Sequence, residues 1–213
     1  RLERSEVFGN TNVAVSLGSG STEANGTAGA VINDNQFFAN GSWAVSVNSG
    51  DALVSGNHVF NNGGGITASY NGQLAPVRIV DNVIHDNSSN GISGSFWVHA
   101  VGNTVYGHAG TFGINLFDTR ALAQDNVVYR NANGINLSVG PTARNNRVFD
   151  NAGVGIDIGN GGTAEGNRVY GNATGISESG GRVANNVVYD NRTTGISTAG
   201  YRPSALQGVF NNT

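Results

Sequence analysis

Six residues between positions 70 and 120 have the side chains best suited to binding or chemistry: Tyr70, Phe96, Trp97, Phe117, Asp118 and Arg120. Their rings offer flat apolar faces, while the carboxylate and the guanidinium can form charged hydrogen bonds. A sugar polymer has matching chemistry, because its rings have apolar faces and a rim of hydroxyl groups. We therefore predict that these six residues bind substrate. Asp118 and Arg120 are the candidates for catalysis, and no other catalytic residue is assigned.

A second interpretation of these rings stays open. They could instead pack loops against the body of the protein or cover a neighbouring domain. Hydrolysis of a glycosidic bond needs carboxylates that converge, whereas Asp150, Asp157 and Asp190 occupy different outward positions of a repeat. The sequence also contains no Lys and no nucleophile or phosphate-binding motif. Whether the chain is an enzyme is therefore left undecided.

The four histidines lie in the N-terminal half of the chain, at positions 58, 85, 99 and 108. They occupy different positions of the repeat, so we expect their side chains to point in different directions and to share no metal ion. His108 stands where other repeats have Asn and should replace it. With no Cys in the chain, we predict no metal site and no cofactor; calcium is left open without a motif to support it.

Repeats of about 21 residues must position all of these side chains. Between Leu122 and Ile196 nearly the same sequence motif occurs four times, with its first Asn at positions 126, 146, 167 and 186. A second Asn follows five residues later, and a Gly-Ile or closely related pair ends the unit. A unit of this size cannot bury its own apolar face, so the period predicts that successive units stack into a solenoid.

Apolar and polar residues alternate within each unit, which is typical of short strands. The residue two places after the first Asn is always apolar, and the next is aromatic in every unit except at His85. Traced from Ser5 to Gln207, this register predicts an all-β, single-stranded parallel β-helix of about ten coils, with residues 1–213 as one domain. The asparagines should turn corners in left-handed conformations and form hydrogen-bonded ladders.

One residue conflicts with the pattern. Glu178 takes a position at which other units place an inward-pointing Leu or Ile. A buried carboxylate without a partner is costly, so we expect either a local shift of register or the end of a strand there.

The composition of the chain limits the classes of binding partner that we expect. The net charge is −3 and the pI is near 5.7, with no run of basic residues, so we expect no nucleic-acid binding. No apolar run is long enough to insert into a membrane. The chain starts and stops within a repeat, so we expect a fragment of a longer protein. Its open ends should meet neighbouring domains or self-associate.

The unit N-x-V-[FY]-x-N-x(2–4)-G-I resembles the repeat of the right-handed pectate-lyase-like superfamily, and the resemblance covers nearly the whole chain. It implies a right-handed parallel β-helix, polysaccharide as the partner, and an extracellular or cell-surface location. If the chain is an enzyme, the resemblance implies a polysaccharide lyase, an epimerase or a hydrolase-like activity. The alginate epimerase motif of the superfamily is absent.

Two functions follow from this. The first is an extracellular β-helix module that binds or acts on polysaccharide along one lateral face. The second is a structural stalk or adhesin segment of a large surface protein, without catalysis.

Overall fold

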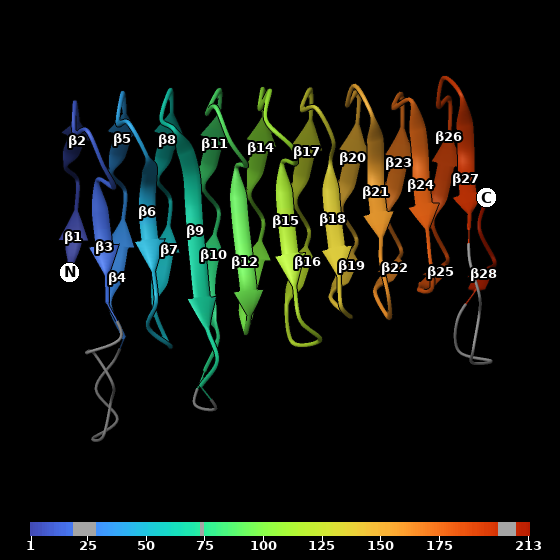
Figure 1. Ribbon diagram of the computed structural model, residues 1–213, viewed down its shortest axis with the longest axis horizontal. Helices are drawn as coiled ribbons and strands as arrows, with labels where there is room; N and C mark the ends of the chain where they lie inside the picture. Colours follow the sequence, from blue (N-terminus) through green and yellow to red (C-terminus); the bar gives the residue numbers. More distant parts are fainter. Residues whose placement is uncertain (19–28, 73–74, 200–207) are drawn as a thin grey trace.

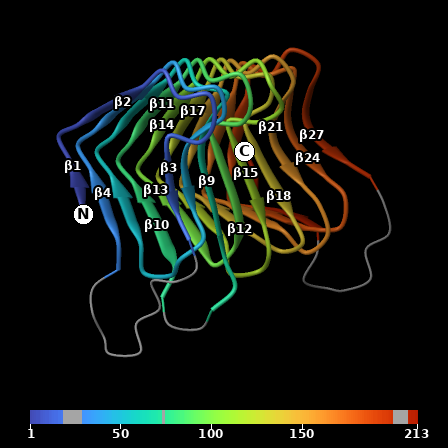
Figure 2. The same cartoon turned by 60° about the vertical axis from the view of Figure 1, so that its left-hand side comes forward.

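The computed structural model describes residues 1–18, 29–72, 75–199 and 208–213. All regular structure in these residues consists of short strands, which form three parallel sheets along one rod (Figure 1). Successive strands along the chain belong to successive sheets, so each coil contributes one strand to each sheet (Figure 2). No helix in the described residues could cross a membrane.

Sheet A contains β1 (Leu2–Glu3), β4 (Val31–Asn33), β7 (Leu53–Ser55), β10 (Val77–Val80), β13 (Val98–Val101), β16 (Leu122–Gln124), β19 (Thr142–Arg144), β22 (Thr163–Glu165), β25 (Arg182–Ala184) and β28 (Gly208–Phe210). Sheet B contains β2 (Glu6–Phe8), β5 (Gln36–Phe38), β8 (His58–Phe60), β11 (Val83–His85), β14 (Thr104–Tyr106), β17 (Val127–Tyr129), β20 (Arg147–Phe149), β23 (Arg168–Tyr170) and β26 (Val187–Tyr189). Sheet C contains β3 (Val15–Leu17), β6 (Trp43–Val47), β9 (Gly64–Tyr70), β12 (Ile92–Phe96), β15 (Ile114–Phe117), β18 (Ile135–Ser138), β21 (Val154–Ile158), β24 (Thr174–Glu178) and β27 (Thr194–Thr198).

This architecture confirms the predicted right-handed, all-β parallel β-helix. The described residues form somewhat fewer complete coils than the ten expected, because β28 is the only described strand of the last coil. The predicted register is wrong for this coil: β28 pairs with β25 in sheet A, and Asn212 continues the asparagine ladder after Asn186, where Gln207 was expected. Gln207 itself and most of the insertion at 18–29 lie outside the described residues.

The core is built from columns of identical or similar residues. In sheet B, Val128 pairs with Val148 and Val148 with Val169, and all three are fully buried. Ile135, Ile156 and Ile176 form the equivalent column in sheet C. Because parallel strands are about 4.8 Å apart, each side chain packs directly on its counterpart in the next coil, and one continuous core results.

Two ladders of buried asparagines follow the corners between the sheets. In a typical rung, the Asn126 side-chain Nδ2 donates to Asn146 Oδ1 at 2.9 Å and to the Ala100 carbonyl at 2.9 Å. The Asn126 backbone N–H also donates to Asn146 Oδ1, at 3.0 Å. These bonds satisfy polar groups that the solenoid buries at every turn, so the predicted ladders are confirmed.

The explanation of the corners by asparagine conformation needs correction. The first ladder is the one that contains Asn126 and Asn146, and its asparagines do not have positive φ. The residue before each of them does, as at Asp81 (54°), Asp125 (55°) and Asn145 (56°). The preceding residue therefore makes the left-handed corner, and the ladder Asn is left free to turn its amide inward.

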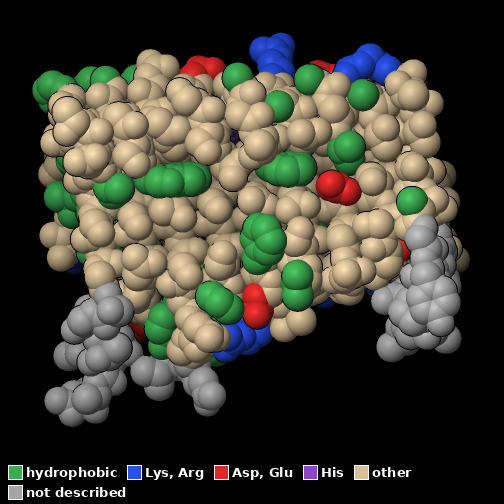
Figure 3. All heavy atoms as spheres, viewed as in Figure 1, with side chains coloured by type: hydrophobic (Ala, Val, Ile, Leu, Met, Phe, Trp, Pro, Cys, Tyr) green, Lys and Arg blue, Asp and Glu red, His purple; other side chains and the backbone are tan. Residues whose placement is uncertain are grey.

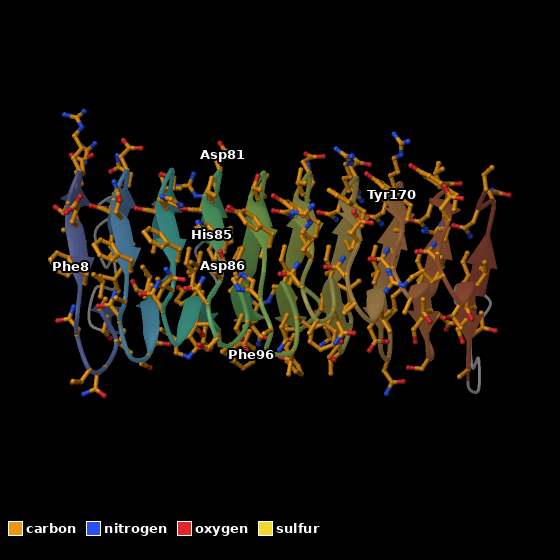
Figure 4. All side chains as sticks on the ribbon, turned by 90° about the horizontal axis from the view of Figure 1, so that it is seen from above. Phe8, Asp81, His85, Asp86, Phe96 and Tyr170 are labelled. Carbon is orange, nitrogen blue, oxygen red and sulfur yellow. The ribbon has the colours of Figure 1, made fainter. Side chains whose placement is uncertain are left out.

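An aromatic ladder runs along the outer face of sheet B. Adjacent rings have centroids 4.7–5.3 Å apart and planes within 14° of each other. His85, the exception in the sequence pattern, continues the stack between Phe60 and Tyr106. Figure 4 shows Phe8, His85 and Tyr170 of this ladder following one another along the rod, on a different side from Phe96.

Glu178 is the last residue of β24, which confirms the expected strand end, and the alternative of a register shift is wrong. It stays in register within β24, paired with Ile158 and Thr198, and its side chain is buried. Its carboxylate accepts the backbone N–H groups of Gly180 and Gly181 at 2.7 and 2.8 Å. The turn after β24 thus supplies hydrogen bonds that compensate the burial of the charge.

Candidate functional site

Sheet C presents the face on which most of the predicted site residues lie. Its outer surface has an open hollow of about 370 Å³, lined by Ser69, Ser95, Phe96, Phe117, Asp118 and Val139. Phe96 and Phe117 are 37% and 42% exposed, an unusual exposure for large rings on a regular sheet. Figure 3 shows hydrophobic side chains gathered below the middle of this face, beside an acidic and a basic group.

Strained backbone forms one side of the hollow. Phe96, Asp118 and Val139 end or follow the strands of three successive coils, and their φ angles are 66°, 90° and 62°. Positive φ is costly for a bulky or β-branched residue. Here it bends each chain away from the sheet, and the Val139 side chain is left 62% exposed. Such outliers are typical of binding and catalytic sites, which supports a functional interpretation of this corner.

Asp118 is fixed by its own turn. Its carboxylate accepts the backbone N–H of Arg120 at 3.1 Å, and its carbonyl accepts the N–H of Ala121 at 3.0 Å. The Arg120 Nε lies 3.6 Å from the same carboxylate oxygen. The Asp118 side chain remains 31% exposed, so the carboxylate can accept further hydrogen bonds from a ligand in the hollow.

The Arg120 guanidinium is directed away from the hollow and binds the segment after β9. Its two terminal nitrogens donate to the Gly72 carbonyl and to Asn71 Oδ1, each at 3.0 Å. Its central carbon lies 5.4 Å from the centre of the Trp97 ring, within the range of a cation–π contact. Arg120 and Trp97 therefore attach one loop to the rod, beside the hollow.

Tyr70 also belongs to this loop cluster. Its Cα pairs with that of Phe96, as the repeat predicts. Its ring nevertheless occupies the space beside two glycines: a Cβ added at Gly50 or Gly72 would approach the ring or its hydroxyl within 2.3 or 1.9 Å. The six predicted residues thus form two adjoining groups, with Phe96, Phe117 and Asp118 at the hollow and Tyr70, Trp97 and Arg120 in the loop.

Three residues of the hollow were not found from the sequence: Ser69, Ser95 and Val139. Val139 follows Ile135 by four residues, the same offset that relates Tyr70, Phe96 and Asp118 to the isoleucines of their own coils. That offset is a sequence signal for Val139, whereas selection by rings and charges does not include an aliphatic residue. Ser69 and Ser95 pair in register on β9 and β12.

A stripe of polar side chains runs beside the hollow along sheet C. It consists of one outward residue from each of five successive strands, paired in register: Thr67, Ser93, Asn115, Asn136 and Asp157. The Asn136 Nδ2 donates to Asn115 Oδ1 at 2.7 Å. This stripe offers donors and acceptors at each level of the rod, next to the exposed rings.

The chemistry available in the hollow is limited. Asp118 is the one carboxylate among its lining residues, whereas acid–base cleavage of a glycosidic bond uses a pair. No group of three or more His, Asp or Glu side chains within the described residues could hold a metal ion. The hollow therefore offers apolar ring faces and one carboxylate to a ligand.

Comparisons with known proteins agree with the fold. The model of the family described as "Right handed beta helix region" matches residues 2–121 and residues 92–213. The solved structures of the periplasmic alginate epimerase AlgG and of a point mutant of it are similar to this chain at 16% sequence identity, with TM-scores of 0.55 and 0.57. Each alignment covers 96% of this chain but 62% of the epimerase, and likeness at this identity concerns the fold alone.

The mannuronan C-5 epimerase AlgE4 A-module of Azotobacter vinelandii aligns with 99% of this chain and 56% of its own, at 16% identity and a TM-score of 0.49. A search of curated proteins found no match.

Proposed function

The chain belongs to the right handed beta helix family, and on that basis we propose that it is an exported module that binds polysaccharide along the outer face of sheet C. The observation that carries this proposal is the hollow in which exposed Phe96 and Phe117 flank the carboxylate of Asp118. The rings would stack on the apolar faces of sugar units, and Asp118 with the adjacent polar stripe would bind hydroxyl groups.

Binding without catalysis is the form of the function that the site supports best. Asp118 has no second carboxylate beside it among the lining residues. The guanidinium of Arg120 is engaged by Gly72, Asn71 and Trp97, so it is not directed at a ligand. The solved neighbours named alginate epimerases make alginate the first ligand to test.

The test is a titration of the protein with alginate and with neutral oligosaccharides. Binding is measured by calorimetry and by the fluorescence of Trp97 and Trp43. The informative variant is Phe117→Ser, because Ser95 and Ser138 pair with Phe117 in the adjacent coils and show that serine fits the position. We expect Phe117→Ser to weaken binding at least tenfold and to leave stability unchanged. The control is Val187→Ser, which removes a similarly exposed apolar side chain from sheet B and should leave binding unchanged.

The second candidate function is a stalk without a ligand. The packing of Tyr70, Trp97 and Arg120 within one loop favours it, since half of the predicted binding residues have a structural role there. Absence of binding to all acidic and neutral glycans would support the stalk. Release of unsaturated sugars from uronate polymers, lost in Asp118→Ala, would instead show that the module is a lyase.

A further inference from the structure

Two histidines meet on the outer face of sheet B, away from the hollow. His58 begins β8 and His85 ends β11, the neighbouring strand. Their Nε2 atoms are 2.7 Å apart, and their ring centroids are 4.9 Å apart. The sequence argument that histidines in different columns point in different directions is wrong for this pair, because the first and third residues of a three-residue strand both face outward. In adjacent coils such residues are diagonal neighbours.

Asp86 selects the tautomer of neutral His85. Its Oδ2 lies 2.8 Å from His85 Nδ1, and an ionised carboxylate can only accept a hydrogen bond. His85 therefore carries its proton on Nδ1, and its Nε2 presents a lone pair to His58 (Figure 4 labels His85 and Asp86). A histidine that binds a metal ion commonly has this arrangement, with a carboxylate on the nitrogen opposite the ligating one.

We propose that His58 and His85 form a two-histidine site for a divalent transition metal ion such as Zn²⁺, Ni²⁺ or Cu²⁺. In the metal-free protein a single proton, carried by His58 Nε2, lies between the two nitrogens. A metal ion takes the place of that proton between the two nitrogens, and neutral His58 then carries its proton on Nδ1. Asp86 orients His85 from the far side of its ring.

The geometry requires only a small movement. Zn–N bonds are about 2.0–2.1 Å long, so two nitrogens at tetrahedral angles lie about 3.4 Å apart. The present separation of 2.7 Å must therefore grow by about 0.7 Å, which side-chain rotations can supply at this partly exposed position.

The donor set also defines the class of metal. Imidazole nitrogens favour Zn²⁺, Ni²⁺ and Cu²⁺, whereas Ca²⁺ and Mg²⁺ favour oxygen ligands. No third His, Asp or Glu completes the set in the described part of the chain. The remaining coordination positions are therefore open to water, and we expect exchangeable binding that strengthens from Ni²⁺ to Cu²⁺.

The experiment is a calorimetric titration of the untagged protein with Zn²⁺, Ni²⁺ and Cu²⁺, and with Mg²⁺ as a negative control. Two variants copy the chain's own coils: His85→Phe restores a ring of the aromatic ladder, and His58→Gln copies Gln36, which pairs with His58 in the preceding coil. We expect each to weaken Zn²⁺ binding at least tenfold. Asp86→Asn should weaken it about ten- to a hundredfold.

His99→Ala is the matched control, because His99 lies in sheet A, in β13, and should bind no metal. Near-ultraviolet circular dichroism will check that the aromatic ladder is intact in every variant. One site per chain that is lost in His58→Gln and His85→Phe but kept in His99→Ala supports the proposal. The proposal is overturned if His58→Gln and His85→Phe bind Zn²⁺ as tightly as the unchanged protein does. It is also overturned if the unchanged protein does not bind Zn²⁺.

Discussion

Replacing His108 by Asn should make the protein more stable and less sensitive to acid. His108 occupies a rung of the second asparagine ladder, as predicted from the sequence, and is 1% exposed. The backbone N–H of Asn87 donates to its Nδ1 at 3.2 Å, and its own N–H donates to Asn131 Oδ1 at 3.1 Å. Its Nε2, however, is buried without a hydrogen-bond partner in either neutral tautomer.

The expected gain at neutral pH follows from that nitrogen. A buried polar group without a partner costs about 1–3 kcal/mol, and His108→Asn removes it. The amide needs no new space, because a Cβ added at Gly91 would approach His108 Nε2 within 2.4 Å, and one added at Gly113 would approach the Asn131 Nδ2 within 2.8 Å. Ring and amide therefore occupy equivalent places. We expect the free energy of unfolding to rise by about 1–3 kcal/mol.

The response to acid gives a second, independent change in the free energy of unfolding. Burial lowers the pKa of His108 from 6.5 to about 4. Between these values the unfolded chain binds more protons than the folded protein, so stability falls as the pH is lowered from 6.5 to about 4 and His108 contributes no further loss below that. Each pKa unit corresponds to about 1.4 kcal/mol, so His108 accounts for a loss of about 3 kcal/mol. His108→Asn should abolish that part of the loss.

Urea unfolding at about pH 7.5 and about pH 4, monitored by circular dichroism and by intrinsic fluorescence, measures both the gain at neutral pH and the acid-induced loss. Comparison between variant and unchanged protein cancels the contributions of the other titrating groups. His99→Asn is the control, since His99 is outside the ladder, and it should keep the acid-induced loss due to His108. An equally large acid-induced loss in His108→Asn, together with no gain at neutral pH, would refute the reasoning.

Three further predictions concern the backbone and the buried polar groups. Val139→Gly should raise the melting temperature, because it relieves a φ of 62° at an exposed valine and should gain about 1 kcal/mol; Val187→Gly, at an exposed strand position with ordinary φ, should lower it. Glu178→Leu should cost about 2–4 kcal/mol in urea unfolding, because the N–H groups of Gly180 and Gly181 lose their acceptor. Glu178→Gln keeps an acceptor and should cost clearly less, and equal losses would contradict this account. Asn151→Ala should cost at least about 3 kcal/mol, because its side chain bonds with Asn131, Asn172 and the Phe149 carbonyl; a loss below about 1 kcal/mol would show that the ladder contributes little.

The sequence predicted the candidate site in part. Tyr70 and Phe96 each lie four residues after the isoleucine of their own coil, and this shared offset corresponds to their pairing in adjacent strands. It could not predict that glycines at positions 50 and 72 leave room for the Tyr70 ring in the loop, since those contacts join different coils. It also could not predict that a left-handed φ at Phe96 and Val139 turns these side chains outward.

The repeat also did not predict side-chain contacts between diagonal neighbours in adjacent coils. The columns of the repeat compare each residue with its counterpart in the next coil, so they describe direct stacking well. His58 and His85 stand in different columns yet share a hydrogen bond. Arg147 and Tyr170 show the same diagonal relation, at 2.8 Å. These contacts depend on side-chain length and direction, which the period does not specify.

The sequence by itself determined the solenoid, its register through the ninth coil, its asparagine and aromatic ladders and its apolar core. The physical reason is that in-register parallel stacking places each residue over its counterpart about 21 positions away, so one-dimensional periodicity becomes three-dimensional contact. Only the tertiary structure decided which rings face solvent, how Glu178 is satisfied and which histidines meet. Those outcomes arise where coils differ from one another, at corners and diagonals, and they depend on backbone angles and available space.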